Sequence, residues 1–202
     1  QCGATVIWDE PSATDNCQAL EIESDHASGS VFEVGTTIVT FTVSDTNGLV
    51  STESFEITVV DLELPVITAL PTDMTLVANP GTCSAEHEWV SPEVSDNCIV
   101  LSFMSNFQSG DSFPVGVNNI AYTAQDPTGN IQTESFTVTV LDEEFPVIHD
   151  VPADFQVSTD FGLCTATVDW AQETSSDNCG ILEHASSMQP QDVFELGTTI
   201  VD

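Results

Sequence analysis

Hydrophobic and polar residues alternate along much of this chain with a period of two. In the segment SFTVTVLD, Phe136, Val138 and Val140 fall on one face of an extended strand, and Thr137 and Thr139 fall on the other. Alternation of this kind is typical of half-buried β-strands, and the spacing expected of helices is absent. The sequence therefore predicts an all-β fold.

Short strands are predicted at regular intervals. In the central part of the chain we expect about seven of them, near residues 65–69, 74–78, 83–90, 99–105, 111–115, 118–126 and 133–141. The segments DTNG and DPTG, which precede the last strand of a copy, have Asp first and Gly fourth, the pattern of a type I turn. Short strands with turn signals between them predict an immunoglobulin-like β-sandwich.

The whole pattern repeats every 81 residues without a gap. Cys2, Cys83 and Cys164 keep this step, and so do Trp8, Trp89 and Trp170. We therefore predict tandem domains: a partial repeat over residues 1–61, a complete one over 62–142 and a partial one over 143–202. The linkers DLELP and DEEFP are short and not rich in glycine or serine, so neighbouring domains should be closely coupled. The opening QCGATVIW reads as the middle of a domain, as expected of part of a longer polypeptide.

The charge of the chain is far from ordinary. It has 33 Asp and Glu residues and no Lys or Arg, which gives a formal charge of −33. Binding to phosphate or to an anionic membrane through a basic patch needs cations, so nucleic acid is excluded as a partner. No apolar run approaches the length of a membrane span, so no membrane insertion is expected. Because no Lys or Arg can relieve the self-repulsion, solvent counterions or bound metal cations must do so, which points to calcium.

Several spaced motifs match a known family. They are PVI, P-x-D, G-x-C, a single W, S-D-N-C, F-P-V-G, D-x-x-G-N, S-F-T-V-T-V and D-x-E-x-P. Together they resemble the HYR (hyalin repeat) domain, over all of the second repeat and the present parts of the others. The resemblance implies immunoglobulin-like sandwiches in tandem arrays on extracellular proteins. Long acidic arrays of this kind are similar to those of large bacterial surface adhesins, including gliding-motility adhesins.

The cysteines depart from the family pattern. Many members carry more of them, on strands occupied here by Ala69, Phe103, Tyr122 and Ser135, whereas this chain has two per repeat. An even, periodic count in an extracellular-looking chain predicts disulfides. Zinc is a poor alternative, because the four histidines fall at four different repeat positions.

Two disulfide pairings are open. We favour bonds within repeats: Cys2–Cys17, Cys83–Cys98 and Cys164–Cys179. In a plain sandwich, however, the two cysteines of a repeat lie at opposite ends of a strand, about 20 Å apart. A disulfide needs Cα atoms within about 7 Å, so the intervening loop would have to fold back along the strand. The alternative joins neighbouring repeats as Cys2–Cys98 and Cys83–Cys179.

Acidic and amide side chains are predicted to gather at the junctions between repeats. In an immunoglobulin-like sandwich the BC loop, the FG loop and the entry of the first strand share one end. We therefore predict a calcium site at each junction, since calcium takes about six to eight oxygen ligands. The candidate ligands are Asp61, Glu63, Asp96, Asn97, Asp126 and Asn130 at the first junction, and Asp142, Glu144, Asp177 and Asn178 at the second. The turn alone could account for Asp126, an Asx-turn for Asp96 and Asn97, and solvated linker charge for the two glutamates.

The remaining singled-out residues favour packing over chemistry. The three tryptophans lie on the inward face and predict core rather than sugar stacking. The apolar segment LSFMSNF, at residues 101–107, predicts packing or an adhesive patch. No Ser/His/Asp set recurs and no glycine-rich phosphate loop is present, so we predict no enzyme activity.

Two functions follow from these patterns. The first is a structural stalk or filament of a secreted cell-surface adhesin, with neighbouring repeats and other chains in a fibre as partners. The alternative is a module appended to a secreted enzyme that binds a polysaccharide or a protein receptor.

Overall fold

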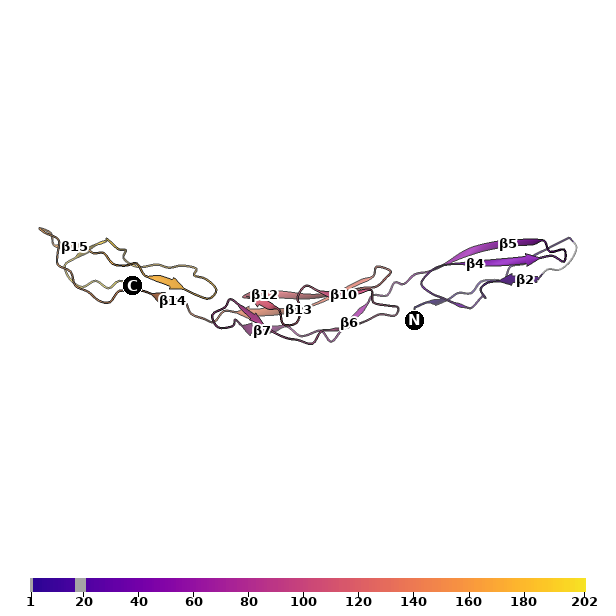
Figure 1. Ribbon diagram of the computed structural model, residues 1–202, viewed down its shortest axis with the longest axis horizontal. Coiled ribbons are helices and arrows are strands. Elements are labelled where there is room, and N and C mark those ends of the chain that lie inside the picture. The colour runs from indigo at the N-terminus through magenta and orange to yellow at the C-terminus, as the bar shows by residue number, and fades with distance from the viewer. Residues whose placement is uncertain (1, 17–20) are drawn as a thin grey trace. The chain divides into compact units, whose positions relative to one another are not determined.

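The computed structural model describes residues 2–16 and 21–202, and over these residues it contains strands but no helix (Figure 1). Accordingly, no helix in the described ranges could span a bilayer. The chain divides into two compact units. One comprises Gln1–Pro71, Ser91–Phe107 and Ala121–Ser135, and the other comprises Thr72–Val90, Gln108–Ile120 and Phe136–Asp202. The division passes through the second repeat, so each unit contains one junction. The predicted all-β fold is confirmed.

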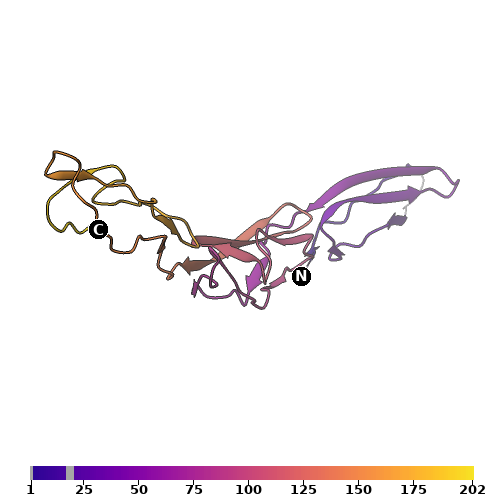
Figure 2. The same ribbon diagram turned by 60° about the vertical axis from the view of Figure 1, so that its left-hand side comes forward.

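The first repeat is built around a long antiparallel hairpin. Strands β4 (Gly35–Ser44) and β5 (Val50–Val59) pair along their whole length, with Val39 opposite Phe55, and lie side by side in Figures 1 and 2. Strand β2 (Glu21–Ser24) pairs with the other edge of β4. A second, smaller sheet joins β1 (Ala4–Thr5) to β3 (Val31–Phe32).

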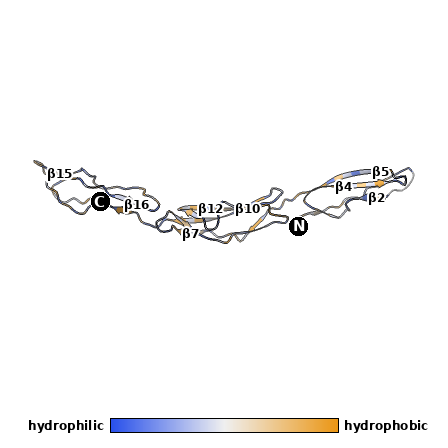
Figure 3. Cartoon of the chain, viewed as in Figure 1, coloured by the Kyte–Doolittle hydropathy of each residue, from blue (hydrophilic) through white to orange (hydrophobic). Residues whose placement is uncertain are grey.

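The core of the first repeat lies between these two sheets. Phe32, Val39 and Ile57 are buried, and Trp8 packs against Phe32 and Phe55 with ring centroids 5.9 and 5.4 Å apart. Figure 3 shows hydrophobic residues interspersed with polar ones along β4 and β5, as one buried face and one solvated face require. The arrangement is a β-sandwich.

In the second repeat, strands of the first unit pair at the end nearer residue 61. Strand β6 (Val66–Thr68) pairs with β9 (Glu93–Ser95), and β10 (Ser102–Ser105) pairs with the last residues of β12 (Gly116–Gln125). The rings of Phe103 and Tyr122 stack with centroids 5.4 Å apart.

The strands of the second unit complete this repeat. Strand β8 (Ser84–Glu86) pairs with β11 (Ser112–Pro114), and β7 (Met74–Val77) runs parallel to the end of β13 (Ile131–Leu141). Trp89 contacts Phe113 and Phe136 at centroid distances of 5.8 and 5.5 Å.

The third repeat shows the same two short pairings. They join β14 (Val147–His149) to β16 (Thr174–Ser176), and β15 (Thr165–Thr167) to β17 (Val193–Glu195). Trp170 packs against Phe194 at 5.9 Å. The predicted core role of the three tryptophans is thereby confirmed.

One strand prediction was wrong in a way that matters for the junction. Residues 83–90 were expected to form a single strand, but β8 ends at Glu86 and the chain then continues into β9, which pairs with a different partner. Between them the Trp89 N–H donates to Ser109 Oγ, and that hydroxyl donates to the Trp89 carbonyl, both at 2.8 Å. The chain therefore leaves one sheet and enters another within a single repeat.

Candidate functional site

The disulfides join neighbouring repeats. Cys2 is bonded to Cys98, and Cys83 to Cys179, with Cα atoms 4.5 and 4.7 Å apart. Each bond lies inside one compact unit and links residues 96 apart in the sequence. Cys164 is exposed and forms no disulfide with a described residue.

The favoured within-repeat pairing is therefore wrong. Cys83 and Cys98 bond to different neighbours, and Cys179 bonds to Cys83 rather than to Cys164. The proposed Cys2–Cys17 bond fails because Cys2 is used elsewhere; Cys17 itself lies outside the described residues. The physical reason is that the loop after β8 does not fold back along that strand but extends into β9, which carries Cys98 away from Cys83.

The linker residue Asp61 is the centre of the first junction. It is only 5% exposed. Its Oδ1 accepts hydrogen bonds from the Glu63 N–H at 3.1 Å and from Asn97 Nδ2 at 3.3 Å. Its backbone carbonyl accepts one from Asn130 Nδ2 at 3.1 Å. The linker is thus held by the loop that carries Asn97 and by the turn that carries Asn130.

The turn at Asp126 is closed by its own buried carboxylate. Oδ1 accepts from the backbone N–H groups of Thr128, Gly129 and Asn130 at 2.7–2.9 Å. Oδ2 accepts from Thr128 Oγ1 and Asn130 Nδ2 at 2.9 and 2.7 Å. Burial raises the pKa of Asp126, but the hydrogen bonds from Asn130, Thr128 and Gly129 outweigh it, so the net pKa lies below the ordinary value. Both oxygens are already occupied by donors, as the predicted turn requires.

Three other buried oxygens at this junction have no donor. They are Asp61 Oδ2, Asp96 Oδ2 and Asn97 Oδ1. Asp96 uses its other oxygen to accept from the Cys98 N–H at 2.9 Å, an Asx-turn. Oxygen or sulfur atoms of Asp61, Asp96 and Cys98 lie within 4.8 Å of one another. Because the Cys98 sulfur is part of a disulfide, only the oxygens are available to a cation.

The second junction repeats part of this arrangement. Asp142 Oδ1 accepts from the Glu144 N–H at 3.1 Å and from Asn178 Nδ2 at 3.2 Å, and Asp177 Oδ1 accepts from the Cys179 N–H at 2.8 Å. Asn178 Nδ2 also donates to the Thr82 carbonyl at 2.8 Å. Asp142 is exposed, however, unlike Asp61.

The two linker glutamates, Glu63 and Glu144, make different hydrogen bonds from those of the linker aspartates. The hydrogen bond described for Glu63 uses its backbone N–H, whereas Glu144 Oε2 accepts from the Gly81 N–H at 2.9 Å. The sequence analysis placed Asn97 and Asn178 at the junctions as oxygen ligands, whereas the structure shows their amide nitrogens donating to the preceding linker. Their regular place in the DNC triplet was the available signal.

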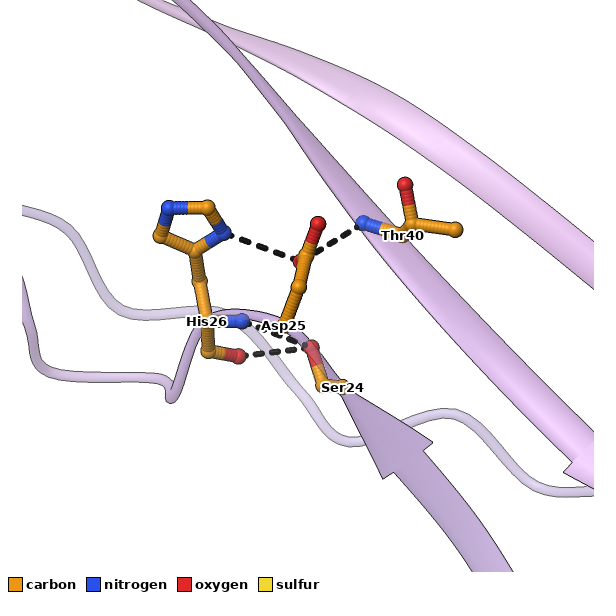
Figure 4. Close-up of polar contacts among 4 residues, drawn as sticks. All are labelled: Ser24, Asp25, His26 and Thr40. Atoms are coloured by element: carbon orange, nitrogen blue, oxygen red, sulfur yellow. Dashed lines mark hydrogen bonds and ion pairs between the residues drawn. The ribbon is translucent and has the colours of Figure 1, made fainter.

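A Ser/Asp/His neighbourhood after β2 has a structural role. His26 Nδ1 lies within hydrogen-bond distance of Asp25 Oδ1, 2.9 Å away. Ser24 Oγ donates to the His26 backbone carbonyl at 2.6 Å and not to the histidine ring (Figure 4). The Thr40 N–H and, secondarily, His26 hold the pKa of Asp25 below its usual value. Asn106 takes the place of Asp25 in the second repeat and likewise accepts from the backbone, at Ala121. Asp25 therefore fastens this loop to β4, and the geometry does not activate Ser24 as a nucleophile, because the His26 ring does not accept its proton.

Comparisons with known proteins agree with the repeat. The HYR domain family model matches residues 1–59 and 60–140. The chain is 33% identical to hyalin of Strongylocentrotus purpuratus over 207 residues, which cover 98% of this chain and 17% of that protein. Against hyalin of Lytechinus variegatus the identity is 33% over 206 residues, covering 98% and 38%.

A further relative shares a shorter segment. It is the rat (Rattus norvegicus) sushi, von Willebrand factor type A, EGF and pentraxin domain-containing protein 1, which is 32% identical over 139 residues, or 66% of this chain and 4% of that protein. The chain thus spans less than two fifths of the length of these relatives. All three are animal proteins, so they give no support to the bacterial adhesin context.

Proposed function

Because this chain belongs to the HYR domain family, we propose that it is a connecting stalk segment of a long extracellular repeat protein that acts in cell adhesion. The observation that carries the proposal is the pair of disulfides between neighbouring repeats. A protein that only displayed independent binding domains would gain nothing from bonding each domain to the next. Disulfides between repeats instead suit a chain whose function is to hold each domain against the next one.

The chemistry of the chain supports an extracellular, cell-surface location. Structural disulfides form and persist in oxidising compartments. The charge of −33 keeps like chains apart and limits non-specific association. The partners that we propose for the whole protein are a surface polysaccharide or a protein receptor, together with other chains in a fibre, and no enzymatic step is assigned to this segment.

The alternative is a polysaccharide-binding module appended to a secreted enzyme. Such modules stack sugar rings on exposed aromatic side chains, but the three tryptophans here pack against phenylalanines of their own repeats. The stalk is therefore the better supported function. Binding of the isolated chain to a glycan array would favour the alternative.

Electron microscopy of the oxidised chain tests the proposed stalk. We expect elongated particles with a narrow distribution of bend angles. A control chain carrying Cys2→Ser and Cys83→Ser should be elongated but more variable, because its junctions lack the covalent bond. Compact, rounded particles of the oxidised chain would contradict the stalk function.

A further inference from the structure

The buried oxygens at the first junction are an unsatisfied group of acceptors. Asp61 is 95% buried, yet its Oδ2 has no hydrogen-bond partner. Asp96 and Asn97 are partly buried residues, but Asp96 Oδ2 and Asn97 Oδ1 are buried atoms that also lack a partner. The other oxygen of each carboxylate accepts hydrogen bonds, but a buried oxygen without a donor loses its hydration without compensation. A water molecule or a cation can satisfy such atoms, and a cation suits a group that includes two carboxylates.

The chain itself offers no such partner. It has no Lys or Arg. The histidine ion pairs of the described residues are His26–Asp25 and His184–Glu173, both away from this junction. A cation at this junction would therefore come from solution.

We propose that a calcium ion binds at the first junction, with Asp61, Asp96 and Asn97 as its side-chain ligands. The spacing is suitable: calcium–oxygen distances are about 2.3–2.6 Å, so two ligands on one ion lie no more than about 5 Å apart. One carboxylate oxygen of Asp61 and one of Asp96 meet that limit, since they lie within 4.8 Å of each other, and Asn97 follows Asp96 directly in the chain. An all-oxygen donor set without free thiolate or imidazole favours calcium over zinc.

The other predicted residues of this junction position the ligands. The five donors on Asp126 leave its oxygens occupied, and Asn130 turns its amide nitrogen toward the Asp61 carbonyl. Asn130 thus holds the linker in place, and Asp126 holds the turn that carries Asn130. The Cys2–Cys98 bond fixes the loop that supplies Asp96 and Asn97. The site therefore unites the linker of one repeat with a loop of the next.

The second junction supplies a matched comparison. Asp142 corresponds to Asp61 and receives the same two hydrogen bonds, but it is exposed, and Asn178 Oδ1 is the unpartnered buried oxygen described there. Water can satisfy an exposed carboxylate, so a cation is not required. We therefore expect the first junction to bind calcium more tightly than the second.

Titration of the oxidised chain with CaCl₂, in 150 mM NaCl (about physiological ionic strength), tests the site by calorimetry. We expect saturable binding with a Kd between about 10 μM and 1 mM, in or just below the range of extracellular calcium modules. Asp61→Asn should weaken this binding at least tenfold, whereas the control Glu143→Gln, at an exposed linker residue with no assigned ligand role, should leave it within about twofold. Equal binding by wild type and Asp61→Asn, or no saturable binding by wild type, would overturn the proposal.

A second measurement does not depend on variants that might fold poorly. In NMR spectra of the wild-type chain, calcium should shift the backbone amides of Asp61, Asp96, Asn97 and Cys98 more than those of the second junction. Magnesium at the same concentration should have a smaller effect, because it gives up its water ligands reluctantly. Shifts spread evenly over exposed acidic residues would mean a diffuse ion atmosphere and no site.

Discussion

At the scale of single residues, the DNC triplet gives each of its members a separate task. In the second repeat, Asp96 closes an Asx-turn on the Cys98 N–H, Asn97 donates to the preceding linker at Asp61, and Cys98 bonds to Cys2. The third repeat assigns the same tasks to the equivalent residues at 177–179. The triplet is therefore a device for binding the previous repeat rather than a catalytic motif.

The Asp126 turn should make stability depend on pH in a definite direction. Its pKa is lower in the folded chain than in the unfolded chain, so its contribution to the free energy of unfolding is present above the unfolded pKa, about 3.9, and is lost as pH falls toward the lower folded pKa. Asp126→Asn removes that contribution. We expect the variant to melt below wild type at pH 6, and the gap between their melting temperatures to narrow below about pH 4.

Calorimetric melting curves between about pH 6 and pH 2.5 measure this gap. Glu143→Gln, a change in the exposed second linker, serves as the control and should stay close to wild type throughout. A gap for Asp126→Asn that is the same at every pH would show that the turn does not depend on the ionised carboxylate.

At the scale of strands and linkers, the central finding is that the second repeat changes sheets between β8 and β9, as the third does between β15 and β16. Since both strands are only three residues long, neither gives the sustained alternation from which strands are predicted. The long strands β4, β5, β12 and β13 were predictable because hydrophobic and polar residues alternate along about half of their ten or eleven residues. The sheet change was not, and it decided the cysteine pairing.

The candidate junction shows the same limit of sequence reasoning. The repeat and the topology of a sandwich were enough to bring Asp61, Asn97 and Asn130 together. The sequence could not distinguish the calcium ligands from the residues that position them, because the distinction depends on which oxygen lone pairs already accept a hydrogen bond. The sequence does not distinguish Asp126 from Asp96. In the structure both carboxylate oxygens of Asp126 accept hydrogen bonds, whereas Asp96 has a buried oxygen without a donor.

Cleavage of a linker gives a direct test of the junction. Trypsin has no Lys or Arg to recognise, but a glutamate-specific protease can cut after the exposed Glu63. The Cys2–Cys98 bond should then hold the two pieces together on a denaturing gel until a reductant is added. A Cys98→Ser chain should separate after cleavage without reductant. Separation of the oxidised wild-type pieces would contradict bonding between repeats.

At the scale of the whole molecule, the two disulfides overlap in the sequence. The Cys2–Cys98 bond ends at residue 98, but the Cys83–Cys179 bond has already begun at residue 83. A continuous covalent route therefore runs through both bonds and needs only the 15-residue step between Cys83 and Cys98. The backbone between Cys2 and Cys179 is 177 residues long, and nearly all of it lies outside this route.

Pulling the chain from its ends should reveal the short route. Between Cys2 and Cys179 the oxidised chain can be stretched to roughly 50 Å of backbone plus the two bonds, whereas the reduced chain can reach roughly 600 Å. Optical-tweezers traces should show this difference as several hundred ångströms of length released only after reduction. Equal release in both states would contradict the overlapping bonds.

The consequence concerns where tension travels. In an array of overlapping bonds, force passes from cysteine to cysteine and largely bypasses the β-sandwiches, so the domains need little mechanical strength of their own. Such an array extends when a disulfide is exchanged or reduced. A thiol reagent, and not a larger force, would therefore increase its length.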